Sequence, residues 1–333
     1  MNSIKVLDVT LRDGGYVNNW EFGFDEAKSI LETVYKSGVD YVEAGFIGEY
    51  VNEDGRVCFD TMEALSKVFL PSQAKICAMT YVDEYPVEKF PERSDKTVDM
   101  VRVIVYKRNF DEGLQYVRTL IEKGYDACVQ LARTDQFDLS EIGDYVKRWN
   151  DVHPMAVYLV DSFGTYDAAK TLAYAKEFDK NLGDDIYLGF HAHNNMQQAL
   201  TNVTAFCEHP WKHKIILDAS VLGMGRGAGN MNLEMLLNYL NNTMNKHYDL
   251  NPIIEVADKY IDKYSKQFEW GYSIPYFLCA LNGCNHRFVH YLLEKNVCFT
   301  EMSKIFQQMK KDGTGIRFNT ELLDELINKY CNK

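Results

Sequence analysis

The chain lacks the features of several large classes of protein. No apolar run approaches the roughly 18 residues that a membrane-spanning helix needs, and the best candidate, Ile274–Leu281, is short. The first residues show no apolar core followed by a small-residue cleavage site, so we expect no export signal. The 8 cysteines are scattered and form no C-x-x-C pair. Because buried reduced thiols are the ordinary explanation for cysteines in apolar runs, we expect a reduced, cytoplasmic protein.

Positive charge is also scarce. The sequence has 36 Lys and Arg residues against 48 Asp and Glu residues, a formal net charge of −12. Nucleic-acid binding needs clustered cations that meet phosphates, and an anionic membrane surface repels a negative protein. We therefore expect neither a nucleic acid nor a membrane as a partner.

The signatures of several common enzyme classes are missing. The sequence contains no P-loop, no G-x-S-x-G elbow of the serine hydrolases and no G-x-G-x-x-G after the first expected strand. Lysines are missing from the ends of the expected strands, which argues against a Schiff-base aldolase. The composition, with 46% apolar and 25% charged residues, is nevertheless that of an ordinary globular protein.

Eight short apolar runs recur along the first 220 residues. They begin near residues 4, 39, 74, 99, 125, 155, 186 and 214, and their mean spacing of about 30 residues is the length of one strand–helix unit. Helical periodicity fills most gaps, at 25–36, 110–123, 139–149, 167–178, 196–207 and 231–244. Pro86 and Pro91 indicate a loop or a short helix after the third run. The alternation predicts an α/β fold, a TIM barrel over residues 1–245, with an open doubly wound sheet as the alternative.

The strand pattern stops near residue 245. Helical segments are predicted at 252–264, 274–281, 286–294, 300–310 and 321–331. We therefore expect a helical C-terminal extension over residues 246–333, which acts as a lid over the barrel or as a docking surface. We also expect a homodimer, with a partner enzyme bound at the extension as a further hypothesis.

The clearest functional signal is His191-Ala192-His193 at the end of the seventh expected strand. Alternate residues of a strand share a face, so both imidazoles point the same way. Asp13, after the first strand, is expected beside them because the strand ends of a barrel meet at one rim. Two histidines and one carboxylate can bind a divalent metal and leave positions open for water and substrate. The alternative is a pair of hydrogen-bonded structural histidines.

Further polar residues follow other expected strands. Arg12 is suited to stabilise an oxyanion beside the metal, or it forms a rim salt bridge with Glu43 or Asp161. Glu43 in turn is suited to orient Arg12 or a metal-bound water, with a purely structural ion pair as the alternative. Arg133 and Ser162 follow the fifth and sixth strands, and we expect them to bind substrate.

A glycine-rich segment, GMGRGAGN at Gly223–Asn230, follows the eighth strand. Backbone N–H groups in such a loop can hold an anion, especially where the loop opens a helix. We therefore expect Gly225 and Arg226 at the substrate. Asn230 is suited to cap the next helix or to reach the metal through its amide oxygen.

Three motifs together resemble the DRE-TIM metallolyase superfamily: D-x-T-L-R-D-G at 8–14, H-A-H-N at 191–194 and G-x-G-x-x-A-G-N at 223–230. This family includes 4-hydroxy-2-oxovalerate aldolase, 3-hydroxy-3-methylglutaryl-CoA lyase and the isopropylmalate synthases. The resemblance implies that Asp13, His191 and His193 bind Mn²⁺ or Mg²⁺, with Asn230 as a candidate further ligand. It also implies that Arg12 stabilises an enolate oxygen. Zn²⁺ is chemically compatible with the same ligands.

The chain also departs from this family. The aldolases carry an acid/base histidine after the RDG, and here the corresponding residue is Tyr16, whose unperturbed pKa near 10 makes it a ready proton donor. The RDGEQ of the synthases is missing, and Arg226 replaces the loop cysteine of the acyl-CoA lyases.

The prediction is a metal-dependent carbon–carbon lyase that acts next to a 2-oxo acid through a metal-bound enolate, for example one that converts a 4-hydroxy-2-oxo acid to pyruvate and an aldehyde. Arg12, Tyr16 and Glu43 are the predicted catalytic residues. The alternatives are a Claisen-type acyl-CoA synthase or acyl-CoA lyase, a non-haem iron oxygenase, and a non-catalytic barrel that binds a metal and an oxo acid and docks a partner.

Overall fold

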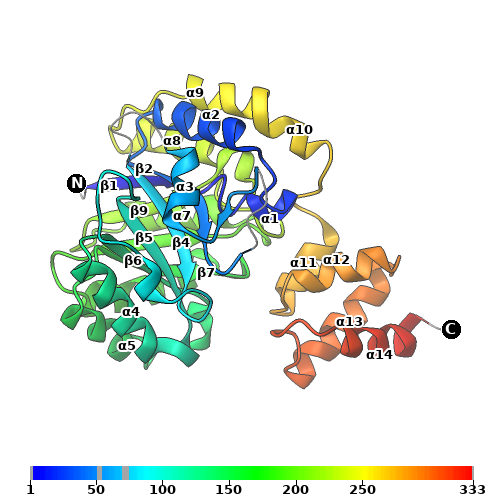
Figure 1. The fold of residues 1–333 in the computed structure, drawn as a ribbon. Helices are drawn as coiled ribbons and strands as arrows, with labels where there is room; N and C mark the ends of the chain where they lie inside the picture. Colours follow the sequence, from blue (N-terminus) through cyan, green and yellow to red (C-terminus); the bar gives the residue numbers. More distant parts are fainter. Residues whose placement is uncertain (1–2, 51–54, 70–74, 332–333) are drawn as a thin grey trace.

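The structure, a computed structural model, describes residues 3–50, 55–69 and 75–331. Its centre is a ring of eight strands: β1 (Ile4–Asp8), β2 (Tyr41–Ile47), β4 (Ile76–Tyr81), β5 (Met100–Val105), β6 (Asp126–Leu131), β7 (Ala156–Asp161), β8 (Tyr187–Ala192) and β9 (Ile215–Ala219). Each strand pairs in parallel with the next, and β1 pairs with both β2 and β9, which closes the ring (Figure 1). The predicted TIM barrel is confirmed, and every predicted strand begins within two residues of the observed one.

Helices cover the outside of the ring. The longer ones are α2 (Phe24–Tyr35), α4 (Phe110–Glu122), α5 (Ile142–Arg148), α6 (Ala168–Asn181), α7 (Ala199–Glu208) and α8 (Leu233–Thr243). Helix α2 buries Ala27, Ile30, Leu31 and Val34, the i, i+3, i+4, i+7 spacing of an apolar stripe that packs on the strands. Helical periodicity in the sequence therefore located these helices.

Shorter elements fill the connections. They are α1 (Gly15–Asn18), α3 (Met62–Leu65) and the 3₁₀ turns η1 (Ser66–Val68), η2 (Val87–Lys89), η3 (Lys107–Asn109), η4 (Thr134–Gln136), η5 (Trp149–Asp151) and η6 (Val221–Gly223). After β4 only η2 forms before β5, as Pro86 and Pro91 predicted. A short strand, β3 (Cys58–Phe59), pairs with β2 and was not predicted.

Side chains fill the barrel interior in layers. The deeper layer is apolar and includes Leu7, Val9, Tyr41, Cys77, Met100, Cys128, Ala156, Tyr158 and Ile216. Alternate strand residues point the same way, so the next inward positions after Tyr41, Met100 and Ile216 are Glu43, Arg102 and Asp218, and all three are buried. A charged layer therefore lies above the apolar one, towards the C-terminal ends of the strands, where TIM barrels place their active sites.

The C-terminal helices divide into two groups. In the first, α9 (Asn251–Val256), the π-helical turn η7 (Ala257–Ile261) and α10 (Asp262–Ser265) pack on the barrel and add Ile253, Val256 and Ile261 to its core. In the second, α11 (Ile274–Leu281), α12 (Arg287–Glu294), α13 (Phe299–Asp312) and α14 (Thr320–Cys331) form a separate lobe with its own core (Figure 1). We call this group the helical lobe. The predicted helical extension is present, and its helices join two different cores, the first group that of the barrel and the second that of the helical lobe.

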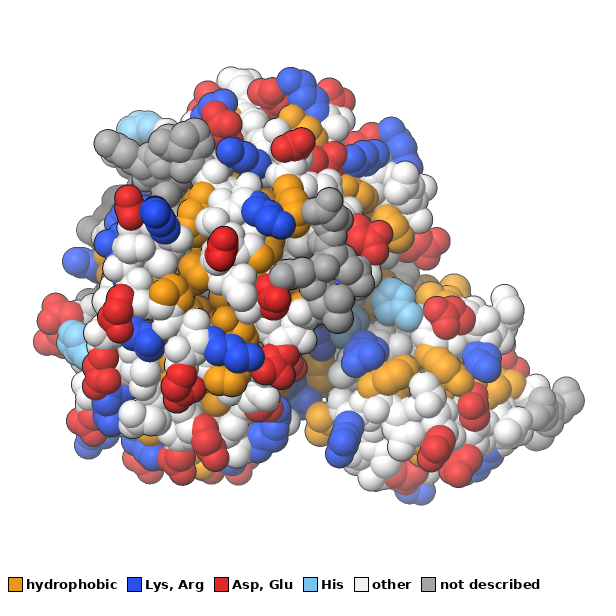
Figure 2. Space-filling view, in the orientation of Figure 1, with side chains coloured by type: hydrophobic (Ala, Val, Ile, Leu, Met, Phe, Trp, Pro, Cys, Tyr) orange, Lys and Arg blue, Asp and Glu red, His pale blue; other side chains and the backbone are white. Residues whose placement is uncertain are grey.

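The helical lobe lies against the C-terminal mouth of the barrel. A deep indentation separates the two in the space-filling view (Figure 2), and residues of both line a cavity of about 840 Å³ there. Ala228 from the glycine-rich loop joins the core of the lobe. The lobe thus forms one wall of the site at the barrel mouth, in the position expected for a lid. No helix in the described ranges is long and apolar enough to cross a membrane.

Candidate metal centre

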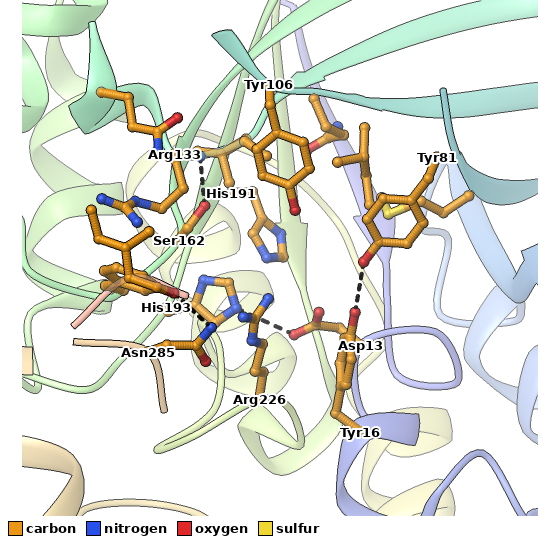
Figure 3. A pocket seen from close by; sticks show the side chains of 18 of the residues that line it. Asp13, Tyr16, Tyr81, Tyr106, Arg133, Ser162, His191, His193, Arg226 and Asn285 are labelled. Atoms are coloured by element: carbon orange, nitrogen blue, oxygen red, sulfur yellow. Dashed lines mark hydrogen bonds and ion pairs between the residues drawn. The ribbon is translucent and has the colours of Figure 1, made fainter. Parts of the chain in front are cut away.

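Three buried side chains, Asp13, His191 and His193, meet at the barrel mouth. One potential ligand atom from each lies within 4.8 Å of the others, and Asp13 Oδ2 is 3.6 Å from His193 Nε2. The side chains point toward one another, and their residues are only 2–5% exposed (Figure 3). Residues far apart in the sequence therefore converge as predicted.

Different local structures hold the three residues. His191 lies within β8 and His193 directly follows it, where its backbone bridges to that of Asn230. Asp13 lies beyond the end of β1, in a turn in which its N–H donates to the Val9 carbonyl (2.8 Å). Strand alternation accounts for the two histidines, whereas the turn after β1 decides where the carboxylate goes.

A hydrogen bond orients each imidazole through its Nδ1. His191 Nδ1 is 2.8 Å from Asp218 Oδ2, and His193 Nδ1 is 3.0 Å from the Asp161 carbonyl oxygen. Both contacts fit a neutral ring that donates from Nδ1 and keeps the Nε2 lone pair for a metal. Burial lowers the pKa of His191, which favours this neutral form at pH 7.

Three buried polar atoms at the barrel mouth have no hydrogen-bond partner in the described part of the protein. Asp13 Oδ2, His193 Nε2 and Asn230 Oδ1 are buried and have no hydrogen-bond partner among the described residues. A buried polar atom without a partner costs free energy, so three at one place indicate an ion. A Cβ on Gly225 would lie 2.9 Å from Asp13 Oδ2 and 2.3 Å from Asn230 Nδ2, so only glycine leaves this space open. The donors fit a divalent cation.

Asn230 does not cap the following helix. Helix α8 begins at Leu233, and its N-cap residue is Asn232. The Asn230 amide group instead donates to the Met224 carbonyl (3.2 Å), which leaves its oxygen without a partner. The capping interpretation is therefore wrong, and Asn230 becomes a candidate ligand.

A series of buried ion pairs links Arg12 to Asp218, the hydrogen-bond partner of His191. Arg12 donates from Nη1 to Asp13 Oδ1 (2.5 Å) and from Nε to Glu43 Oε2 (2.7 Å). The same Glu43 oxygen accepts from Arg102 Nη1 (2.9 Å), and Arg102 Nη2 donates to Asp218 Oδ2. Glu43 does not line the cavity, so its contact with the site is through Arg12.

The ion pairs of Arg12 and Arg102 keep the carboxylates of Asp13 and Asp218 ionised. Burial opposes ionisation of Asp13, but Arg12 and the two imidazoles outweigh it and hold the pKa of Asp13 well below its usual range. Burial also opposes ionisation of Asp218, and Arg102 with His191 lowers the pKa of that group. Both carboxylates are therefore charged at neutral pH, as a metal ligand and its supporting partner require.

Tyr16 faces the same cavity. Its hydroxyl is 3.0 Å from the Tyr81 hydroxyl (Figure 3), and the Arg226 guanidinium carbon lies 5.4 Å from its ring centroid. Burial raises the pKa of Tyr16 above its ordinary value near 10. At neutral pH Tyr16 is therefore protonated and can donate a proton.

The predicted substrate-binding residues occupy different places. Arg133, Ser162 and Arg226 line the cavity, and the Arg133 N–H donates to Ser162 Oγ (2.8 Å). Gly225 lies behind, against Asp13. The glycine-rich loop does not open α8, and the N–H groups of residues 224 and 228–230 donate to acceptors within the protein, so few loop amides remain for an anion.

Sequence reasoning missed several residues of the site. Arg102 and Asp218 each interrupt an apolar strand at an inward-facing position, and that pattern could have revealed them. Asn285, Arg287 and Arg317 reach the cavity from the helical lobe. No local pattern distinguishes these three from surface residues.

Comparison with known proteins identifies the family. A family model described as HMGL-like matches residues 3–259. The chain belongs to the HMGL-like family. Oxaloacetate decarboxylase of Mycobacterium tuberculosis is 27% identical over 248 residues, which cover 70% of this chain and 68% of that protein. 4-Hydroxy-2-oxovalerate aldolase of Bacillus cereus is 25% identical over 262 residues, which cover 77% and 75%.

Solved structures agree with this assignment. The N-terminal domain of a proposed aldolase from Bacteroides vulgatus has a TM-score of 0.77 at 25% identity, with 89% of this chain and 98% of that one covered. The HMGL-like match spans the barrel and most of α9 to η7, and it ends before the helical lobe. The predicted resemblance to the DRE-TIM metallolyases, a family of carbon–carbon lyases, is confirmed.

Proposed function

We propose that this HMGL-like chain is a divalent-metal-dependent lyase that cleaves or forms a carbon–carbon bond next to a 2-oxo acid, as in the conversion of a 4-hydroxy-2-oxo acid to pyruvate and an aldehyde. One observation carries it: the unpartnered ligand atoms of Asp13, His193 and Asn230 meet at the barrel mouth beside the Arg12 guanidinium. The names of the decarboxylase and aldolase relatives support the substrate class.

Asp13, His191 and His193 would hold the ion, with Asn230 Oδ1 as a further ligand. The oxygen and nitrogen donors suit Mn²⁺ or Mg²⁺, and Zn²⁺ is compatible with them. When bound, the ion supplies positive charge that polarises the carbonyl and carboxylate oxygens of the oxo acid.

Arg12 is proposed to stabilise the developing enolate. It lines the cavity, and its Nη2 donates to no other atom in the part of the chain that the structure describes. A preorganised donor aimed at the place where negative charge develops lowers the barrier. Glu43 and Arg102 act as positioning residues, because their ion pairs fix the Arg12 guanidinium.

Tyr16 is proposed to move the proton of the 4-hydroxyl group. In the condensation direction its hydroxyl donates a proton to the oxygen of the aldehyde as the new bond forms. In cleavage it takes that proton back, and the nearby Arg226 charge favours the phenolate. The Tyr81 hydroxyl holds the Tyr16 oxygen in place.

The test is metal-dependent release of pyruvate. Purified protein would be loaded with Mn²⁺ and given 4-hydroxy-2-oxo acids and, because of the decarboxylase relative, oxaloacetate. We expect pyruvate with Mn²⁺, and none after chelation or in Asp13→Asn. Turnover that survives both treatments would reject the mechanism. Thiol release from acetyl-CoA, or oxygen consumption with Fe²⁺, would instead favour the synthase or oxygenase alternative.

The assembly remains a separate proposal. We infer a homodimer in the cytoplasm, with the helical lobe as the surface for a partner enzyme. Light scattering of the purified chain tests the dimer, and a monomer at micromolar concentration would reject it.

A further inference from the structure

The cavity has two ends of different chemistry. At the inner end are the candidate metal ligands and Arg12. Further out the lining is strongly basic, with Arg108, Arg133, Arg226, Arg287 and Arg317 against Asp83 and Glu84. Acidic residues outnumber basic ones in the chain as a whole, so composition does not explain this concentration of arginine.

Several of these arginines have no carboxylate partner. Arg108 pairs with Asp83 and Arg133 pairs with Asp135, but Arg226 donates from Nε to the ring of His286 (2.9 Å). Burial and the Arg226 charge hold the pKa of that histidine well below its usual range, so it is neutral. Arg287 and Arg317 form no ion pair in the described part of the chain. Unpaired cations that line one cavity favour an anionic ligand.

Two buried donors in the same lining also lack an acceptor. Arg133 Nη1 and Gln130 Nε2 have no hydrogen-bond partner among the described atoms, although their residues are only 8% and 3% exposed. Arg133 adopts a left-handed backbone conformation (φ 56°, ψ 52°) that is unfavourable for a residue with a side chain, so its surroundings hold it there. These donors supply hydrogen bonds that a ligand would accept.

The cavity is also larger than a three-carbon oxo acid requires. Its volume of about 840 Å³ lies in the upper part of the range for ligand pockets, about 300–1,000 Å³. Its lining also includes the largely apolar side chains of Tyr81, Tyr106, Val160 and Phe163. A longer second substrate therefore has room to reach the outer arginines.

We propose that the aldehyde half of the substrate carries its own anionic group, a phosphate or a carboxylate, and that Arg287 and Arg317 of the helical lobe bind it together with Arg226. This inference rests on the proposed function. Guanidinium groups bind phosphate and carboxylate through paired N–H donors. The lyase substrate is then a 4-hydroxy-2-oxo acid with an anionic tail.

The proposed reaction balances without another reactant. In condensation, C3 of the oxo acid loses a proton and forms a bond to the aldehyde carbon. The aldehyde oxygen gains a proton and becomes the 4-hydroxyl group. The anionic tail takes no part in these steps, so the lobe arginines recognise it without touching the reacting atoms.

The first test measures condensation with pyruvate for two matched pairs of aldehydes on the Mn²⁺-loaded full chain. The pairs are D-glyceraldehyde 3-phosphate with D-glyceraldehyde, and succinic semialdehyde with butanal. We expect kcat/KM at least tenfold higher for the anionic member of one pair (~1.4 kcal/mol). The pair that shows it distinguishes a phosphate from a carboxylate. A smaller preference in both pairs overturns the proposal.

The second test assigns the preference to the lobe. In the Arg287→Gln/Arg317→Gln double variant we expect the preference to fall to about one- to twofold. The preference is the ratio of two kcat/KM values measured on one preparation. Partial misfolding lowers both values equally, so the ratio does not change. The control is Arg118→Gln/Arg148→Gln, which removes two arginines of α4 and α5 that do not line the cavity, and should keep the wild-type preference. An undiminished preference in the lobe variant overturns the assignment.

A third measurement separates this inference from the proposed function. Exchange of the pyruvate methyl protons with deuterium needs no aldehyde. If the wild type shows no Mn²⁺-dependent exchange, the proposed function fails and this inference fails with it. Deuterium exchange without a preference for anionic aldehydes overturns only the proposal of an anionic tail. Thiol release from acetyl-CoA with pyruvate would assign the arginines to the phosphates of CoA and overturn the aldehyde proposal.

Discussion

The barrel and the helical lobe build the two ends of one cavity in opposite ways. In the barrel, Arg12 and Arg102 are buried, and ion pairs to Glu43 and two aspartates hold them in place. In the lobe, Arg287 and Arg317 are exposed, and no carboxylate of the described ranges pairs with them. Fixed, desolvated charges suit chemistry that needs precise positions, whereas hydrated arginines suit recognition of a ligand's charge. Substitutions in the barrel should therefore reduce activity or stability, and substitutions in the lobe should alter only recognition.

The largest effect is expected at the metal ligands. Asp13→Asn or His191→Ala should remove bound Mn²⁺ and lower the rate of pyruvate release by at least ~10³-fold, because the cation's charge acts directly on the reacting oxygens. Elemental analysis and a pyruvate assay measure both. His247→Ala, at an exposed histidine away from the cavity, should change neither. A ligand variant with full metal content and full rate would contradict the site.

Arg102→Met should destabilise the barrel strongly. Arg102 is 0% exposed and pairs with Glu43 and Asp218, so its removal leaves Asp218 buried without a cation and leaves Glu43 with Arg12 alone. Breaking a buried ion pair in this way costs about 3–5 kcal/mol. Urea unfolding of the metal-free protein measures the free energy of unfolding. A loss below ~1 kcal/mol, nearer to the effect of an exposed substitution, would show that the charged layer is not held as described.

Tyr16→Phe should slow turnover with little effect on metal content. Loss of a general acid typically costs at least ~10²-fold in rate. Because burial raises the pKa of Tyr16, the wild type should keep its condensation activity, in which Tyr16 is the proton donor, through neutral pH and lose it only above pH ~10. A pH profile of kcat tests this. Tyr81→Phe, which removes only the partner of Tyr16, should cost less. Equal rates for wild type and Tyr16→Phe would exclude the proton-transfer role.

Asp8→Asn should flatten the dependence of stability on pH. Burial raises the pKa of Asp8 to about 7, so the folded protein keeps a proton that the unfolded chain releases near pH 4. The free energy of unfolding of the metal-free protein should therefore fall as the pH rises from about 4 to about 7. In the variant this fall in the free energy of unfolding should be smaller by ~1–3 kcal/mol. Urea unfolding at several pH values measures it. Asp161, whose burial raises its pKa to about 6, should keep part of the slope. Parallel profiles would refute the assignment to Asp8.

The smallest effect should be that of the lobe arginines on stability. Arg287→Gln/Arg317→Gln should change the free energy of unfolding by less than ~0.5 kcal/mol, as for other exposed substitutions. Thermal unfolding followed by circular dichroism measures it. A loss as large as that of Arg102→Met would mean that these arginines are structural and would remove the contrast between the two regions.

Local sequence patterns were sufficient to predict the barrel, but not the elements that pack around it. Apolar runs about 30 residues apart predict strand–helix units, and each unit formed where expected. The strand β3 has two residues and no periodicity to reveal it. The helical pattern from residue 252 correctly indicated a helix. A pattern of apolar residues does not show which core those residues join, and Ile253 and Val256 pack on the barrel.

Sequence alone determined the barrel and the shared face of His191 and His193, because strand alternation is a property of a short segment. It also placed Asp13 after the first strand, at the rim where the strand ends meet. Only the tertiary structure decided what surrounds them. It placed Arg102 and Asp218 behind His191, left the Asn230 oxygen free for a ligand, and brought the lobe arginines over the mouth. Each of these contacts joins elements distant in the chain, so it depends on how whole elements pack and not on any local pattern.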